Sequence, residues 1–168
     1  MNTILRFFYN LSLTTWLGIT IFFLAVTVAL FNRMPDVAGR VASLALPLYF
    51  QAGGVCALFA LVSVILLALT VWKGFSPAKK VTPILLILLM AGLNTYGGWV
   101  VLPAAREARI EIHENQKAGA TQTSEQKAAL EKIQNRFQRL HRLSTQLFGV
   151  VFFLIGATII FSSFVLRI

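Results

Sequence analysis

The sequence has few charged residues, a single cysteine and two histidines, and each shortage excludes a class of protein. Charged residues make up 12% of its 168 residues, about half of the roughly 25% that is usual in soluble domains. The chain is therefore not an ordinary soluble domain. The single cysteine, Cys56, excludes an intrachain disulfide and a cysteine-rich metal site. No internal repeat is evident, so the sequence gives no reason to infer an inverted-repeat transporter.

Apolar residues are abundant and come in long blocks. They make up 57% of the chain, and the mean hydropathy is +0.76. A helix needs about 20 apolar residues to cross a hydrocarbon core. The sequence therefore predicts one all-α, polytopic membrane domain over residues 1–168, built as a four-helix up-down bundle. Its spans are expected at about residues 11–31, 41–72, 81–102 and 143–166.

Two details of these spans can be predicted from single residues. Asn32–Arg40 contains Pro35 and Asp36 and is expected to form a turn between the first two spans. Trp16 lies near the start of the predicted first span, where an aromatic side chain at the membrane interface is expected.

The sizeable polar segment, about residues 104–142, is rich in helix-forming residues at both ends. Apolar and small residues recur in its second half at spacings of three, four, three and four, which is typical of a narrow helix-packing stripe: Leu130, Ile133, Phe137, Leu140 and Ser144. We therefore expect spans three and four to continue out of the membrane as a helical hairpin. A disordered loop is the alternative interpretation.

The net charge of +9 does not predict nucleic-acid binding, because the basic residues lie between the apolar blocks, where they anchor spans at the headgroups. Four spans place both termini on one side of the membrane, here called the terminal side, opposite the hairpin side. The terminal side carries five basic residues: Arg6, Lys73, Lys79, Lys80 and Arg167. The hairpin side carries ten, which favours a cytoplasmic hairpin, although the basic loop Lys73–Lys80 argues the other way. The expected location is a bacterial inner membrane, with the lipid bilayer and other membrane subunits as partners.

Polar residues that are distant in sequence fall at one depth on the hairpin side, because the spans alternate in direction. The candidate cluster is Tyr49, Gln51, Asn94, Arg106, His141 and Ser144. One interpretation is that these groups form hydrogen bonds between helices and fix the bundle register. The other is a small polar cavity that handles a small solute or a metal.

Ionisable groups argue against several activities. No Asp, Glu, Lys or Arg falls deep within a span, which disfavours a proton pump or a voltage sensor. His141 would need Asp36, Glu107 or Met34 to complete a metal site. A bis-histidine haem would need a second histidine at membrane level, and His113 is predicted on the hairpin.

Nucleophilic catalysis is disfavoured as well. Ser144 lies three residues from His141 on the same helix, and no carboxylate is evident to orient the pair. No cofactor and no metal is predicted, and a protein without enzymatic activity is favoured.

Short motifs along the chain resemble a known family. They are Trp16-Leu17-Gly18, Ala38-Gly39, Pro47 with Tyr49-Phe50, Asn94, Pro103, Arg106, and Phe137-x-x-Leu140-His141-x-x-Ser144. Together they are similar to the transmembrane protein 205-like family. The resemblance implies a four-span bundle of unknown activity, with Asn94, Arg106, His141 and Ser144 as the residues to test. The long hairpin is an elaboration on that pattern.

Three functional hypotheses follow. The first is small-solute or metal handling at the polar cluster. The second is an accessory or scaffold subunit that docks through its apolar faces and its hairpin. The third is a small haem or redox protein, against which the missing second membrane histidine counts.

Overall fold

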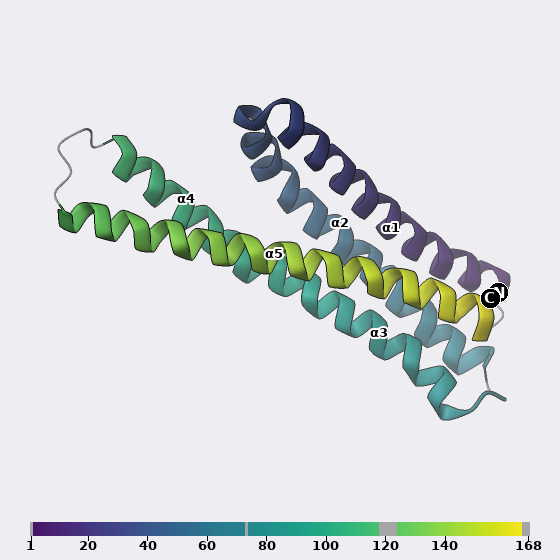
Figure 1. Ribbon diagram of the computed structural model, residues 1–168. Coiled ribbons are helices and arrows are strands. Elements are labelled where there is room, and N and C mark those ends of the chain that lie inside the picture. Colours follow the sequence, from purple (N-terminus) through teal and green to yellow (C-terminus); the bar gives the residue numbers. More distant parts are fainter. Residues whose placement is uncertain (1, 73, 118–123, 166–168) are drawn as a thin grey trace.

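Long helices make up the chain in the computed structural model, which describes residues 2–72, 74–117 and 124–165. The helices are α1 (Asn2–Arg33), α2 (Pro35–Thr70), α3 (Pro77–Tyr96), α4 (Leu102–Lys117) and α5 (Ser124–Val165). A single π-helical turn, η1 (Gly97–Val101), joins α3 to α4 and makes the two one continuous rod. Both termini lie at one end, and the α4–α5 hairpin lies at the other (Figure 1).

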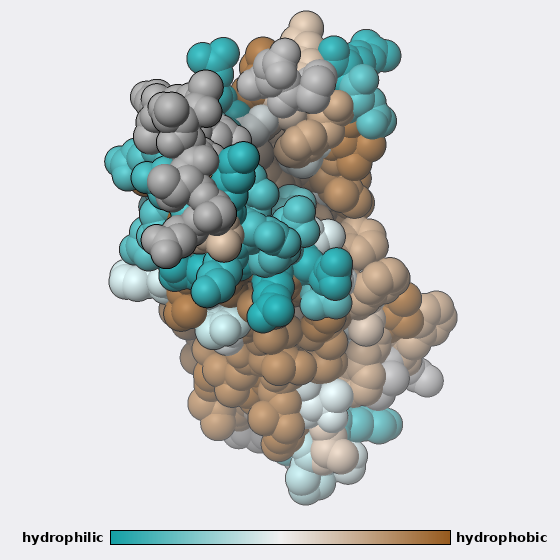
Figure 2. All heavy atoms as spheres, turned by 60° about the vertical axis from the view of Figure 1, so that its left-hand side comes forward, coloured by the Kyte–Doolittle hydropathy of each residue, from teal (hydrophilic) through white to brown (hydrophobic). Residues whose placement is uncertain are grey.

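Four helical stretches are long and apolar enough to cross a membrane: Thr3–Arg33, Val37–Thr70, Pro77–Asn115 and Gln126–Phe164. Large apolar side chains on them face outward, among them Phe22, Leu44, Phe153 and Phe164. Figure 2 shows this hydrophobic surface below the hydrophilic atoms of the hairpin. The chain is therefore a multi-pass membrane protein, and the predicted all-α four-helix bundle with a helical hairpin is confirmed.

The chain turns within the predicted stretch Asn32–Arg40, but the predicted turn is too long, because only Met34 separates α1 from α2. The main-chain N–H of Met34 donates to Leu30 O (2.7 Å), and that of Ala38 donates to Met34 O (2.9 Å). Pro35 occupies the first turn of α2, where its missing N–H has no helical partner to lose. The second helix thus begins six residues before Val41, where the second span was predicted to start.

Trp16 is also not an interfacial residue. Because α1 begins at Asn2, Trp16 lies near the middle of the helix, and its side chain is fully buried. It belongs to a core that includes Leu13, Ala60, Met90 and Ile155.

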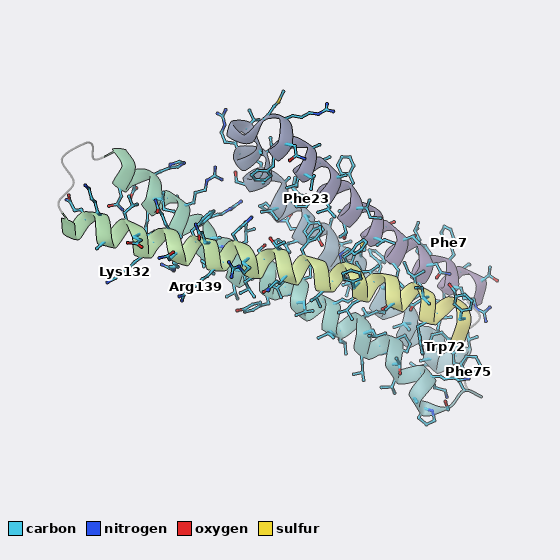
Figure 3. The ribbon with its side chains drawn as sticks, in the orientation of Figure 1. Phe7, Phe23, Trp72, Phe75, Lys132 and Arg139 are labelled. Carbon is cyan, nitrogen blue, oxygen red and sulfur yellow. The ribbon has the colours of Figure 1, made fainter. Side chains whose placement is uncertain are left out.

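The terminal side is closed by polar and aromatic contacts. Tyr9 and Ser162 share a hydrogen bond of 2.6 Å between α1 and α5. Trp72 stacks on Phe75 in the α2–α3 connection, with ring centroids 6.2 Å apart (Figure 3). The first contact joins the start of α1 to the end of α5, and the second shapes the connection between α2 and α3.

The hairpin packs through the predicted stripe. Leu130, Ile133, Phe137 and Leu140 are half-buried, whereas most of the residues between them are exposed. On α4, Ala108 is fully buried. The predicted connection between the two arms, residues 118–123, lies outside the described residues.

Candidate functional site

A polar node lies in the middle of the bundle, where α1, α2 and α3 meet. We define the node as Trp16, Thr20, Tyr49, Gly53 and Asn94. Asn94 is 4% exposed, and its Nδ2 donates to the main-chain oxygen of Phe50 at 2.9 Å. This bond ties α3 to α2 at a depth where no water competes for the groups.

At Gly53, side chains of α1 and α3 closely approach the backbone of α2. A Cβ at this position would lie 2.7 Å from Asn94 Oδ1 and 2.9 Å from Trp16 Nε1. Both distances are shorter than real Cβ contacts, so only glycine fits without moving a neighbour. Gly53 therefore allows the indole and the carboxamide to reach the α2 backbone.

Trp16 Nε1 and Asn94 Oδ1 are buried and make no hydrogen bond of full geometry among the described residues, although the Tyr49 hydroxyl lies near the indole. One is a donor and the other an acceptor, and both approach Gly53. An unpaired polar group in hydrocarbon costs several kcal/mol. The node is thus one place in the bundle where buried polar atoms lack a hydrogen-bond partner; Arg6 Nε and Trp72 Nε1, on the terminal side, are two others.

Tyr49 links the node to the fourth span. Its hydroxyl lies 3.4 Å from Thr20 Oγ1, and Thr20 Oγ1 itself donates to Trp16 O at 2.8 Å. The centroid of the Tyr49 ring lies 5.0 Å from that of the Phe148 ring on α5 and 5.3 Å from that of the Phe23 ring on α1. Aromatic packing, rather than a polar side chain, brings α5 to the node.

Phe50 fills a notch next to the node. A Cβ on Gly97 would lie 2.7 Å from Phe50 Cε1, and one on Gly98 would lie 2.9 Å from Phe50 Cβ. The two glycines belong to η1, where Leu102 N donates to Gly97 O. Pro103 follows directly, and the wider π turn makes room for a ring that clashes with the preceding turn of an α-helix.

Two arginines of α4 hold the hairpin against α2, and we call this pair the arginine clasp. Arg106 Nη2 donates to Ser43 O at 2.7 Å, and Arg109 Nη1 donates to Gly39 O at 2.8 Å. Pro47 lies four residues after Ser43 and has no N–H, so Ser43 O lacks its usual helical donor. Arg106 supplies that missing donor.

Gly39 provides the space for the second bond of the clasp. A Cβ at Gly39 would lie 2.8 Å from Arg109 Nη2. The clasp places the first two turns of α4 beside the first turns of α2. That part of the predicted extramembrane hairpin therefore lies at the level of the α1–α2 connection.

The six residues predicted as one cluster are separated in the structure. Tyr49 and Asn94 meet in the node, both of them buried. Arg106 lies in the clasp, and His141 and Gln51 are exposed. The sixth residue, Ser144, is half-buried on the packing stripe of α5.

His141 packs on its own helix. Its ring stacks on Phe137, with centroids 6.2 Å apart, and its main-chain oxygen accepts from Thr145 Oγ1. His113 is exposed on α4. Among the described residues, no three His, Cys, Asp or Glu side chains are grouped to hold a metal ion.

Five residues of these sites were not predicted as site residues: Trp16, Thr20, Gly53, Gly39 and Arg109. Of these, Trp16 and Gly39 had been named only among the residues that carry the family resemblance, Trp16 also as an interfacial aromatic. The sequence does contain features that point to the two hydrogen bonds of the clasp. Arg109 follows Arg106 by three residues and so shares its helix face, and a proline at position 47 frees the oxygen of residue 43. Nothing in the sequence distinguishes Gly53 from the adjacent Gly54, which has open space at its Cβ.

The fold and the node define a small multi-pass membrane protein in which a few buried polar residues join the helices. The chain belongs to the family described as "Domain of unknown function (DUF4149)", whose model matches residues 11–114. The match includes the node, the clasp and most of α4, and it ends before α5. Comparison with curated proteins and with solved structures finds no match to this chain.

Proposed function

We propose that the protein is an accessory or scaffold subunit that presents a rigid helical hairpin at the membrane surface to another protein. The observation that carries this proposal is the continuity of α5. A single helix of 42 residues, Ser124–Val165, is both the fourth span and one arm of the hairpin. A partner that moves or docks on the arm therefore acts directly on the bundle.

The clasp and the packing stripe support this proposal. Arg106 and Arg109 fix α4 to α2, and the half-buried stripe of α5 packs in the same hairpin. The hairpin is thereby held in one orientation, which reduces the ordering cost of binding. Its outer face includes an apolar side chain, Ile110, that is 57% exposed.

Photo-crosslinking from defined positions tests the proposal. A photoreactive residue at Ile110 or His113 is expected to give one discrete protein adduct in native membranes. The matched control is the same residue at Phe153, which is 74% exposed on the lipid-facing surface of α5 and should give lipid adducts. If the hairpin positions give no protein adduct and the chain purifies in mild detergent as a partner-free monomer, the scaffold proposal is wrong.

A second candidate function is the handling of a small polar solute or a metal at the polar residues. The unpaired Trp16 Nε1 and Asn94 Oδ1 favour it, because buried polar groups in a membrane often belong to a pathway. The surface depression on α5 and the one between α1 and α2 are lined by residues outside the node. Solute uptake that is lost in Asn94→Leu and kept in Gln51→Leu would support this candidate.

The finer likeness to the transmembrane protein 205-like family also stays a proposal. Five of the residues that carry the likeness make contacts between helices: Trp16, Gly39, Phe50, Asn94 and Arg106. Contacts of this kind fix a fold rather than an activity. Contacts that fix the fold agree better with a scaffold than with a haem or redox protein. The visible absorbance spectrum of the purified chain tests directly whether haem is bound.

A further inference from the structure

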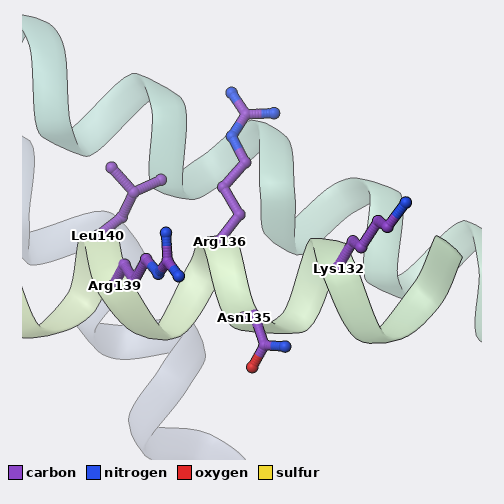
Figure 4. A pocket seen from close by; sticks show the side chains of 5 residues that line it. All are labelled: Lys132, Asn135, Arg136, Arg139 and Leu140. Atoms are coloured by element: carbon purple, nitrogen blue, oxygen red, sulfur yellow. The ribbon is translucent and has the colours of Figure 1, made fainter. Parts of the chain in front are cut away.

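A basic depression lies on the hairpin half of α5. Its volume is about 440 Å³, and it is lined by Lys132, Asn135, Arg136, Arg139 and Leu140 (Figure 4). The three cations recur at spacings of four and three, so they share one side of the helix. The lining contains three positive charges, one amide and no carboxylate.

The charges of this depression are not neutralised within the chain. Among the residues that the structure describes, Lys132, Arg136 and Arg139 form no ion pair, and all three are exposed. Exposed cations that lie close together repel one another unless an anion lies between them. The depression is therefore suited to an anionic ligand.

The clasp fixes the depth of the depression. Arg109 lies nine residues before residue 118, and Lys132 lies nine residues after residue 123, so the two are opposite each other in an antiparallel hairpin. Arg109 in turn contacts Gly39, close to the α1–α2 connection, which lies between Arg33 at the end of α1 and Arg40 in the second turn of α2. The depression thus lies at the level of the lipid headgroups rather than at the tip of the hairpin.

We propose that this depression binds the headgroup of an anionic phospholipid that carries two phosphates. Lys132 and Arg139 are seven residues apart, which is about 10 Å of helical rise and longer than a single phosphate. Each guanidinium can bind a phosphate through two parallel hydrogen bonds. Leu140, on the membrane side, provides an apolar contact for the first carbons of an acyl chain. This lipid site does not depend on the proposed protein partner.

Lipid retention by the purified full-length chain tests the proposal. The chain is incubated in mild detergent with cardiolipin, which has two phosphates, with phosphatidylglycerol at matched total charge, or with phosphatidylcholine. Bound lipid is counted by native mass spectrometry. We expect one cardiolipin to be retained, and the double variant Arg136→Gln, Arg139→Gln to weaken its retention roughly tenfold to thirtyfold, since each cation near a membrane surface contributes about 1 kcal/mol.

The matched control is Arg33→Gln, Arg40→Gln, which removes the same charge at the same membrane level from exposed positions outside the depression. It should retain cardiolipin almost as the natural sequence does. Circular dichroism should show both variants equally helical, because all four side chains are exposed. Equal losses in the two variants, or equal retention of phosphatidylglycerol, would overturn the proposal. So would polyglutamate that binds at the depression and is not displaced by cardiolipin, because the site would then be one for an acidic polypeptide.

Discussion

At the scale of single residues, three side chains join helices by donating to the backbone of a neighbouring helix. Asn94 donates to Phe50 O, and the two arginines of the clasp donate to Ser43 O and Gly39 O. A main-chain oxygen has two lone pairs and can accept a second donor without losing its helical bond. Contacts of this kind need close approach, and glycine is the residue that allows it.

Gly53 offers the sharpest test at this scale. We expect Gly53→Ala to lower the free energy of unfolding by about 1–3 kcal/mol, because its Cβ overlaps Asn94 and Trp16 in a packed interior. Thermal unfolding in detergent, followed by circular dichroism, measures the change. Gly54→Ala is the control, because nothing lies within 4 Å of its Cβ. That variant should be neutral or slightly more stable, since alanine favours a helix. Equal stability of the two variants would contradict this account of the node.

At the scale of elements, hydropathy predicts how many spans there are but not which face of each span is buried. Tyr49 and Gln51 fall at one depth, yet residues two apart on a helix point about 200° apart. Only Tyr49 faces the bundle, and Gln51 is exposed. Depth can be counted along the sequence, whereas the rotation of each helix is set by its packing. This explains why two of six predicted residues meet in the node.

The hairpin was predictable because apolar residues that recur every 3.5 residues show by themselves which face of a helix is buried. Phe137 and Leu140 are half-buried as expected, while the neighbouring His141 falls at the edge of the stripe and is exposed. The clasp was not predictable in the same way. It depends on an oxygen that Pro47 leaves free on another helix, which becomes meaningful only once α4 is known to lie beside α2.

A double-mutant cycle tests the link between Pro47 and the clasp. We expect Arg106→Gln to lower the free energy of unfolding by about 1 kcal/mol, the usual contribution of one net hydrogen bond. In a Pro47→Ala background the loss should be smaller by at least about 0.5 kcal/mol, because the alanine restores a main-chain N–H that can donate to Ser43 O. Chemical unfolding in mixed detergent measures the loss caused by Arg106→Gln with Pro47 present and with Pro47 replaced by alanine.

Arg109→Gln serves as the control for this cycle. Its acceptor, Gly39 O, lies four residues before Ser43, which retains its N–H, so the loss should be the same with or without Pro47. If Pro47→Ala changes the effects of Arg106→Gln and Arg109→Gln equally, the proline acts through the shape of α2 and not through the free oxygen.

At the scale of the whole molecule, the clasp brings basic residues of the hairpin closer to the membrane than the linear sequence suggests. Arg106 and Arg109 lie beside the start of α2, and Lys132 and Arg136 lie opposite them on α5. Basic residues count toward orientation when they are near the ends of spans. The hairpin side thus gains cations that the linear sequence placed further from the membrane. We accordingly propose a cytoplasmic hairpin in a bacterial inner membrane, with both termini on the opposite side.

Cysteine labelling measures this orientation. Cys56 is buried in the bundle, so Cys56→Ala gives a cysteine-free background. In intact spheroplasts, a membrane-impermeant maleimide should label Ser76→Cys, in the exposed α2–α3 connection, and should reach Lys127→Cys on the hairpin after permeabilisation only. Thr3→Cys, also exposed, must behave as Ser76→Cys does, because the α1–α2 pair returns the chain to the side on which it began. Labelling of Lys127→Cys in intact spheroplasts, with Ser76→Cys protected, would mean that the basic α2–α3 connection decides the orientation instead. The hairpin and its headgroup site would then face away from the cytoplasm.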